Sequence, residues 1–152
     1  KGKITITEKG KAVLNGGVFD TLYFDLLNCA IQSWDWGYED RYPDYHFIQQ
    51  SAQQLIERLL TTSSVTVTAM QIFEGVFAKE TRGIDQELKD ELCRCLLVRF
   101  FYRFCIPFGI LKADKDYFFL DKKMNDLFEK TEFFMSQFPK IINGQVSSNK
   151  HH

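Results

Sequence analysis

The spacing of apolar residues over positions 18–34 constrains the fold more than any other feature of this sequence. Apolar side chains recur at steps of one and three along the segment, so that they share one face of a helix: Val18, Phe19, Leu22, Tyr23, Leu26, Leu27, Ala30, Ile31 and Trp34. A stripe of this length needs other elements to cover it. The segment therefore predicts an amphipathic helix that lies against a hydrophobic core.

Four further segments combine helical spacing of apolar residues with turn-forming or proline residues at their ends. We expect helices at 47–60, 65–77, 86–105 and 121–138. Asp85 and Asp121 are the expected N-caps of the last two helices, and Pro107 and Pro139 follow them, where a helix ends. Together with the first segment, they predict about five substantial helices.

A change in the apolar period from about 3.6 to about 2 predicts a β-hairpin late in the chain. Its strands are expected at 108–112 and 116–120, with a polar turn between them. A shorter alternation at 4–7 predicts another strand, followed by a brief helix over 8–14. The expected fold is therefore mainly α with one small hairpin.

Domain organisation follows from the lengths of the breaks between these elements. The polar break at 61–64 is too short for a domain linker, and we expect one helical domain over residues 4–139. The strand and helix at its start repeat the pattern of 117–128, where the strand has a partner before it. On this ground we predict that the chain is the C-terminal part of a longer protein. Residues 140–152 show no periodicity and are expected to form a mobile tail that ends in a tag remnant.

Charge and composition exclude several classes of protein. The chain has 152 residues with 19 basic and 20 acidic side chains, a net charge of −1. No global field therefore attracts nucleic acid or an anionic membrane. No apolar run approaches the roughly 20 residues of a membrane-spanning helix, and no apolar signal core follows the polar start. We expect a soluble, cytoplasmic protein without a membrane partner.

The cysteines do not form a recognisable metal or disulfide pattern. Cys29, Cys93, Cys95 and Cys105 include no Cys-x-x-Cys pair, and His46 is the only histidine before the two at the end. Free cysteine behaves as a small apolar residue. We expect reduced, buried or half-buried thiols and no cofactor.

Several short motifs resemble a family of uncharacterised bacterial proteins with winged-helix-like segments. They are Ile-Thr-Glu-Lys-Gly-Lys at 6–11, Trp34-Asp35-Trp36, Arg41-Tyr42-Pro43, Gln49-Gln50, Arg-Phe-Phe-Tyr-Arg-Phe at 99–104, Phe108-Gly109-Ile110 and Asp126-Leu127-Phe128. The resemblance covers most of residues 4–134. It implies a winged-helix-like arrangement of the long helix, the hairpin and the following helix, and it implies no activity.

The first candidate site is the loop 34–46, which gathers both tryptophans, four acids and His46. Such a mixture can hold a hard cation or supply an acid and a base. The residues in question are Asp35, Glu39, Asp40, Asp44 and His46. The alternative is structural: the aromatic residues fasten the loop to the helices, and Arg41 pairs with a neighbouring acid.

The second candidate site is a basic surface on the long helix and the hairpin, suited to nucleic acid. Its members are Arg94, Arg99, Arg103, Lys112, Lys115, Lys122 and Lys123. Asp114, Asp116 and Asp121 alternate with the lysines and oppose their field, whereas a nucleic-acid footprint needs uncompensated positive charge. We therefore rank this site as an alternative.

Catalytic motifs are absent from the sequence: it has no Gly-rich phosphate loop, no Gly-x-Ser-x-Gly and no His-Glu-x-x-His. Cys93 and His46 could form a nucleophile and base, although a cysteine in an apolar helix is more typical of packing. We expect a non-enzymatic interaction or structural module. Its expected partner is protein, either its own upstream region or a second copy. Nucleic-acid binding and a metal or catalytic role of the loop are the alternatives.

Overall fold

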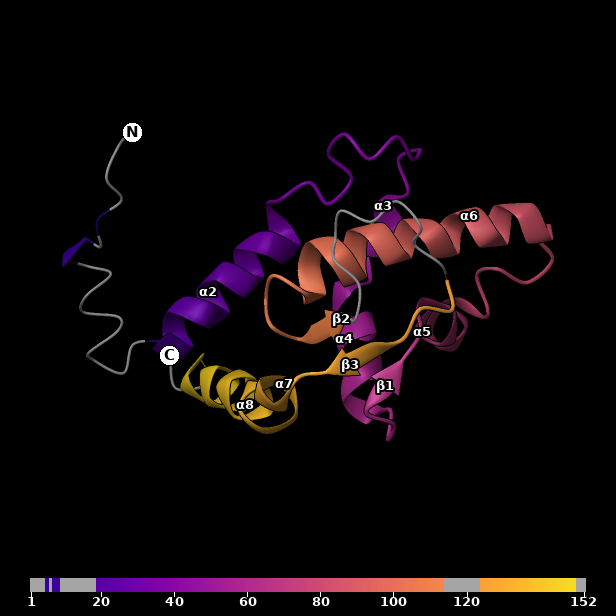
Figure 1. Cartoon of the computed structure of the whole chain (residues 1–152). Helices are drawn as coiled ribbons and strands as arrows, with labels where there is room; N and C mark the ends of the chain where they lie inside the picture. Colours follow the sequence, from indigo (N-terminus) through magenta and orange to yellow (C-terminus); the bar gives the residue numbers. More distant parts are fainter. Residues whose placement is uncertain (1–4, 6, 9–18, 114–123, 150–152) are drawn as a thin grey trace.

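The computed structural model describes residue 5 and residues 7–8, 19–113 and 124–149 (Figure 1). Most of this part of the chain is helical, which confirms the mainly α prediction. The helices are α2 (Phe19–Gln32), α3 (His46–Gln50), α4 (Ala52–Thr61), α5 (Ala69–Phe77), α6 (Gln86–Leu96), the π-helix η1 (Leu97–Cys105), α7 (Glu132–Ser136) and α8 (Phe138–Asn149). The strands are β1 (Thr66–Val67), β2 (Leu111–Ala113) and β3 (Phe128–Lys130). The elements predicted over 4–14 lie almost entirely outside the described residues.

The strands form one antiparallel sheet in the order β1-β3-β2. Phe128 in the central strand faces Val67 on one side and Ala113 on the other. The predicted strand at 108–112 overlaps β2, and its predicted partner at 116–120 lies outside the described residues. The observed partner of β2 is β3, and this sheet does not by itself establish a winged-helix arrangement.

The helix predicted over 121–138 is wrong over residues 124–131, which hold a turn and the strand β3, whereas residues 132–136 are helical and form α7. Phe128 and Lys130 are buried and Glu129 between them is exposed, which is the alternation of a strand. Thr131 then caps α7, since its side chain accepts a hydrogen bond from the backbone N of Phe134 at 3.0 Å. Sheet pairing therefore overrides the local helical pattern.

Pro139 begins a helix rather than ending one. It is the second residue of α8. In the first turn of a helix the backbone N–H groups have no acceptor within the helix, so the missing N–H of proline costs no hydrogen bond. The tail predicted to be irregular is therefore helical from 140 to 149, and its predicted mobility stays a prediction. Residues 150–152 lie outside the described part of the chain.

The start of α5 also differs from its prediction. A helix was expected from Val65, but the β-branched residues Thr66 and Val67 form β1, and Thr68 is the N-cap of α5. The hydroxyl of Thr68 accepts from the backbone N of Gln71 at 3.2 Å, and the Gln71 side chain accepts from the backbone N of Thr68 at 3.0 Å. This capping box fixes the start of α5 at Ala69, with Thr68 as the one residue between the strand and the helix.

The remaining helix predictions agree more closely. α2 matches the segment 18–34, and the segment 47–60 forms α3 and α4 with a break at Ser51. The segment 86–105 is one continuous helical rod, α6 and η1, which Figure 1 shows passing above the sheet. Asp85 caps it as predicted, accepting from the backbone N of Leu88 at 2.8 Å.

The second half of this rod is wound as a π-helix, with a hydrogen bond from the backbone N of Ile106 to the carbonyl of Phe101 at 3.1 Å. It packs against α3 and β2, while α6 packs against α5. Phe100, Phe101 and Phe104 are fully buried on it and form the centre of the core. Among the helices that the structure describes, none combines the length and the hydropathy of a membrane-spanning segment.

Candidate functional site

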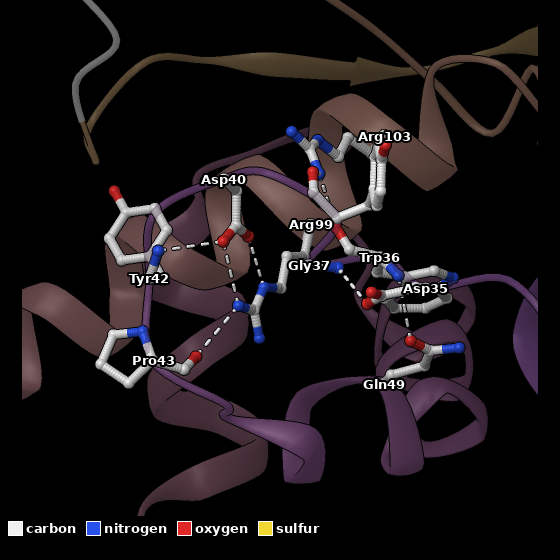
Figure 2. Close-up of polar contacts among 10 residues, drawn as sticks. Asp35, Trp36, Gly37, Asp40, Tyr42, Pro43, Gln49, Arg99 and Arg103 are labelled. Carbon is white, nitrogen blue, oxygen red and sulfur yellow. Dashed lines mark hydrogen bonds and ion pairs between the residues drawn. The ribbon is translucent and has the colours of Figure 1, made fainter.

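The loop between α2 and α3 is held against η1 by arginine side chains, and Arg99 is the more deeply buried of them. Arg99 is only 5% exposed, and its Nε lies 2.6 Å from Oδ2 of Asp40 (Figure 2). Its Nη2 donates to Oδ1 of Asp40 at 3.1 Å and to the carbonyl of Pro43 at 3.0 Å. One side chain of the core therefore fixes two separate points of the loop.

Glycine at position 37 makes room for this arginine. A Cβ atom at Gly37 would lie 2.7 Å from Nη2 and 2.8 Å from Cζ of Arg99, closer than a Cβ contact can be. The guanidinium is already held by Asp40 and Pro43, so it cannot move aside without losing those bonds. The loop therefore needs glycine here to lie so close to η1.

Two more side chains fix the first half of the loop. Nη1 of Arg103 donates to the carbonyls of Trp36 and Tyr38, at 2.9 and 2.6 Å. The Gln49 amide accepts from the backbone N of Trp36 at 3.2 Å and donates to the carbonyl of Trp34 at 2.6 Å. Backbone groups that a loop normally leaves to water are thus satisfied by side chains of α3 and η1.

The backbone around Asp40 is strained. Glu39 and Arg41, on either side of it, have φ values of +53° and +67°, in the left-handed region that non-glycine residues seldom adopt. This geometry accompanies a carboxylate that accepts from Arg99 and also from the backbone N of Tyr42, at 3.0 Å. The ion pair and these hydrogen bonds hold the strained turn in place.

Burial and hydrogen bonding act in opposite directions on Asp40. Burial favours the protonated acid, but the hydrogen bonds from Arg99 and from the Tyr42 backbone outweigh it and lower the pKa of the Asp40 carboxyl. The same pair raises the pKa of Arg99, because Asp40 accepts from the charged guanidinium. Both groups are therefore charged at neutral pH and serve each other as counterions.

The aromatic residues of the loop divide into buried and exposed members. Trp36 is 3% exposed, donates from Nε1 to the carbonyl of Ala30 at 2.8 Å and stacks on Phe104 with ring centres 4.7 Å apart. Trp34 and Tyr38 are 47% and 66% exposed. Trp36 thus fastens the loop to the core, as the structural alternative predicts. Tyr42 and Tyr45 are half-buried against the core, and Trp34 and Tyr38 are largely exposed.

The five residues predicted to bind a metal are not brought together. Asp40 is committed to Arg99, and Asp35 accepts from the backbone N of Gly37 at 2.9 Å. Asp44 and His46 lie 3.5 Å apart on highly exposed side chains, and Glu39 is exposed. Within the described residues, which include the whole loop, no three His, Cys, Asp or Glu side chains are grouped to hold a metal ion. The arginine that pairs with a loop acid is Arg99, not Arg41 as the structural alternative predicts.

The predicted basic surface is also divided. Arg99 and Arg103 are engaged by the loop, and Lys112 lies 3.6 Å from Glu129 in an exposed pair. Arg94 is exposed on α6. The other three members, Lys115, Lys122 and Lys123, lie outside the described residues. The described part of the chain therefore offers Arg94 and Lys112 to a nucleic acid, and a glutamate opposes one of them.

Cys93 and His46 do not form a pair of nucleophile and base. Cys93 is buried, and its burial raises the pKa of the thiol to about 12. His46 is exposed and is paired with Asp44. Cys95 and Cys105 are buried as expected for packing residues, whereas Cys29 is exposed.

Open hollows flank the exposed part of the loop. One of about 530 Å³ lies between Trp34, Asp35 and His46. The other, of about 450 Å³, lies between Trp34, Tyr38 and Glu39. Trp34 and Asp35 line both, so they form a ridge between two concave areas. Nothing in the spacing of the sequence predicts this shape, since it depends on the fixed path of the loop.

Comparison with known proteins yields no family: no protein-family model, no curated protein and no solved structure matches the chain. The function is therefore argued from the geometry of the chain itself.

Proposed function

We propose that this chain is a non-enzymatic interaction module and that it binds a partner protein through the ridge surface, which we define as Trp34, Asp35, Tyr38 and Glu39. The observation that carries this proposal is the pairing of exposed aromatic side chains with a fixed backbone. Trp34 and Tyr38 are 47% and 66% exposed on a loop that Arg99 and Arg103 tie to η1. Tryptophan and tyrosine are enriched among the residues that dominate binding energy at interfaces.

The rigidity of the loop supports binding in a second way. A flexible loop loses conformational entropy when it binds, and a loop fixed in advance avoids much of that loss. Arg103 and Gln49 hold the carbonyls of Trp34, Trp36 and Tyr38, so the backbone beneath the exposed rings is already ordered. The ridge surface is therefore organised for contact before a partner arrives.

The chemistry of the ridge surface favours a basic partner. The carboxylates of Asp35 and Glu39 are exposed beside the aromatic rings. Arg103 lines the same hollow, where its Nη1 donates to backbone carbonyls and not to either acid, and the two carboxylates outnumber this one cation. Arginine or lysine side chains of a partner can pair with the acids and stack on the rings. We propose a basic protein segment as the partner and a cytoplasmic location for the complex.

Peptide binding tests this proposal. Arrays of lysine- and arginine-containing peptides, with acidic peptides of equal length beside them, are probed with the whole chain, and the binding peptides are titrated by calorimetry. We expect basic peptides to bind, and Trp34→Ala to weaken their binding at least about tenfold, as removal of a dominant interface residue does. The double variant Asp35→Asn with Glu39→Gln is expected to reduce the salt dependence of binding.

Leu127→Ala is the matched control, because Leu127 is an apolar residue with 56% exposure outside the ridge surface. Its variant should bind as the wild type does. Equal binding of basic and acidic peptides, or equal affinity of wild type and Trp34→Ala, would contradict the proposal.

Nucleic-acid binding has less support, because Arg99 and Arg103 are engaged within the chain. A mobility-shift assay at low salt tests it directly. Retardation of DNA that Lys112→Ala weakens, without any binding of basic peptides, would favour nucleic acid over a protein partner.

A further inference from the structure

A buried lysine lies far along the chain from the ridge surface. Lys130 ends the central strand β3 and is 5% exposed, although lysine is almost never fully buried without a charged partner. Its Nζ donates to the backbone carbonyl of Thr62, in the segment that connects α4 to β1. Among the residues that the structure describes, no carboxylate pairs with Lys130. A neutral carbonyl is thus the partner of a buried ammonium group.

The environment of Lys130 disfavours its charge. Burial lowers the pKa of the ammonium group, and no neighbouring acid in the described residues offsets this. An ammonium group has three donors, and among the described residues one acceptor receives a bond from Nζ of Lys130. A buried charge with so few partners is costly, and an anion beside it would stabilise it.

Lys130 and Thr62 both line a cavity of about 210 Å³. The other walls combine apolar side chains, among them the fully buried Phe134, with the hydroxyl-bearing Ser63 and Ser64. Leu60, Val65 and Met135 lie at the same cavity and are 39%, 44% and 49% exposed. Three large apolar side chains that remain in contact with water thus surround one hollow whose polar lining includes a cation.

We propose that this cavity binds a small carboxylate with a short apolar chain, such as a short fatty acid. The carboxylate accepts hydrogen bonds from Nζ of Lys130, and the chain covers the exposed parts of Leu60, Val65 and Met135. Charge and apolar area are both required: the apolar walls do not suit a bare phosphate or sulfate, and the ammonium group does not suit a neutral hydrocarbon. The cavity shares no lining residue with the ridge surface, so this proposal does not depend on the proposed protein partner.

Calorimetry with three ligands of matched length separates these requirements. Hexanoate, hexanol and hexylamine are titrated into the whole chain up to about 10 mM, a range suited to ligands of this size. We expect hexanoate to bind and hexylamine not to bind. Hexanol should bind at least about tenfold more weakly than hexanoate, the loss expected for one charge-assisted hydrogen bond.

A series of carboxylates measures the apolar part of the site. Each added methylene that enters the cavity should strengthen binding about fourfold, until the chain outgrows the space and the affinity stops rising. An affinity that does not change from acetate to octanoate would show that the walls do not contact the ligand, and would overturn the proposal.

Lys130→Met removes the charge while keeping an unbranched side chain, and Lys112→Met on the neighbouring strand is the control. Lys112 is exposed and pairs with Glu129, so its variant should bind hexanoate as the wild type does. Lys130→Met should bind at least about tenfold more weakly. Equal binding by both variants, equal binding of hexanoate and hexanol, or no binding of any carboxylate overturns the proposal.

The ligand comparison on the wild-type chain needs no variant, so it remains decisive if Lys130→Met does not fold. Amide chemical shifts of the wild-type chain provide the location. Hexanoate should shift the signals of Thr62, Val65 and Lys130, and shifts confined to the ridge surface would contradict this site.

Discussion

Asp40 and Arg99 meet in a two-point ion pair across 59 residues of chain, with side chains that are 2% and 6% exposed. The pair connects the α2–α3 loop to the π-helical half of the long rod. Because both charges are withdrawn from water, each depends on the other for its solvation. The position of the loop, and of the aromatic residues it exposes, is therefore tied to the core.

Removal of one partner should destabilise the protein strongly. In Asp40→Asn the guanidinium of Arg99 stays buried without a counterion, and we expect the free energy of unfolding to fall by about 3 kcal/mol. Urea denaturation followed by circular dichroism measures the change. Glu129→Gln, which breaks the exposed pair with Lys112, is the control and should cost at most about 1 kcal/mol. Equal costs for the two variants would show that the buried pair contributes no more than a surface one.

Gly37→Ala should lower stability through a steric clash. The added methyl would lie 2.7 Å from Nη2 of Arg99, so the loop or the guanidinium must shift, and we expect a loss of about 1–3 kcal/mol. Gly144→Ala is the matched control, since a Cβ there meets nothing within 4 Å and alanine favours the helix by about 0.5–1 kcal/mol. Thermal unfolding of both variants should give shifts of opposite sign. A rise in melting temperature for Gly37→Ala would contradict the close approach of loop and arginine.

The thiols should react in two groups. Cys29 is exposed and the other cysteines are buried, so a thiol reagent such as dithionitrobenzoate should modify one cysteine per folded chain rapidly and the other three after addition of denaturant. Cys29→Ser should remove the rapid phase. Rapid modification of a second thiol in the folded chain would mean that the helix carrying Cys93, Cys95 and Cys105 is open to solvent.

Stability should fall at alkaline pH because of buried thiols. Burial raises the pKa of Cys93 and of Cys95 from about 9 to about 12, so the folded chain keeps protons that the unfolded chain releases above about pH 9. The free energy of unfolding is therefore unaffected by these groups below about pH 9. It then falls with rising pH by at most about 1.4 kcal/mol per unit for each thiol.

Urea unfolding at several pH values between about 8 and 11 measures this slope. Cys93→Ala should lessen the slope relative to wild type, and Cys29→Ala, at an exposed position, is the control. The same slope for wild type and Cys93→Ala would rule out a contribution from the buried thiol.

Local patterns predict the helices well where a strong stripe or cap is present, as in α2 and at Asp85. They fail at β3, because the three residues Phe-Glu-Lys are too few to show a period. These residues form a strand because they pair with residues 111–113 and 66–67. The hydrogen bonds of Thr68 and Thr131 could have been anticipated from their capping positions, but the helical spacing around them was the stronger signal.

That the loop 34–46 is a functional site stays a prediction, and of its two interpretations the group of metal ligands is not found among the described residues, whereas the structural alternative agrees with the burial of Trp36. The sequence places acids and aromatic residues between 34 and 46, but it does not reveal that the counterion of Asp40 lies on η1. Arg99 was assigned to a basic surface for the same reason. Helical spacing shows that Arg99 and Arg103 lie on one face of the helix, but it does not show which segment covers that face. Lys130 carries no local signal at all, because its burial results entirely from contacts between distant segments.

The order of the strands sets a limit on when the sheet can form during synthesis. β3 is the last of the three to leave the ribosome, yet it lies between the other two and supplies the hydrogen bonds of both. A nascent chain that has reached residue 113 contains β1 and β2. The partner of both strands, β3, has not yet been synthesised. Release of residues 128–130 from the exit tunnel should complete both pairings together, so that the sheet forms late and in a single step.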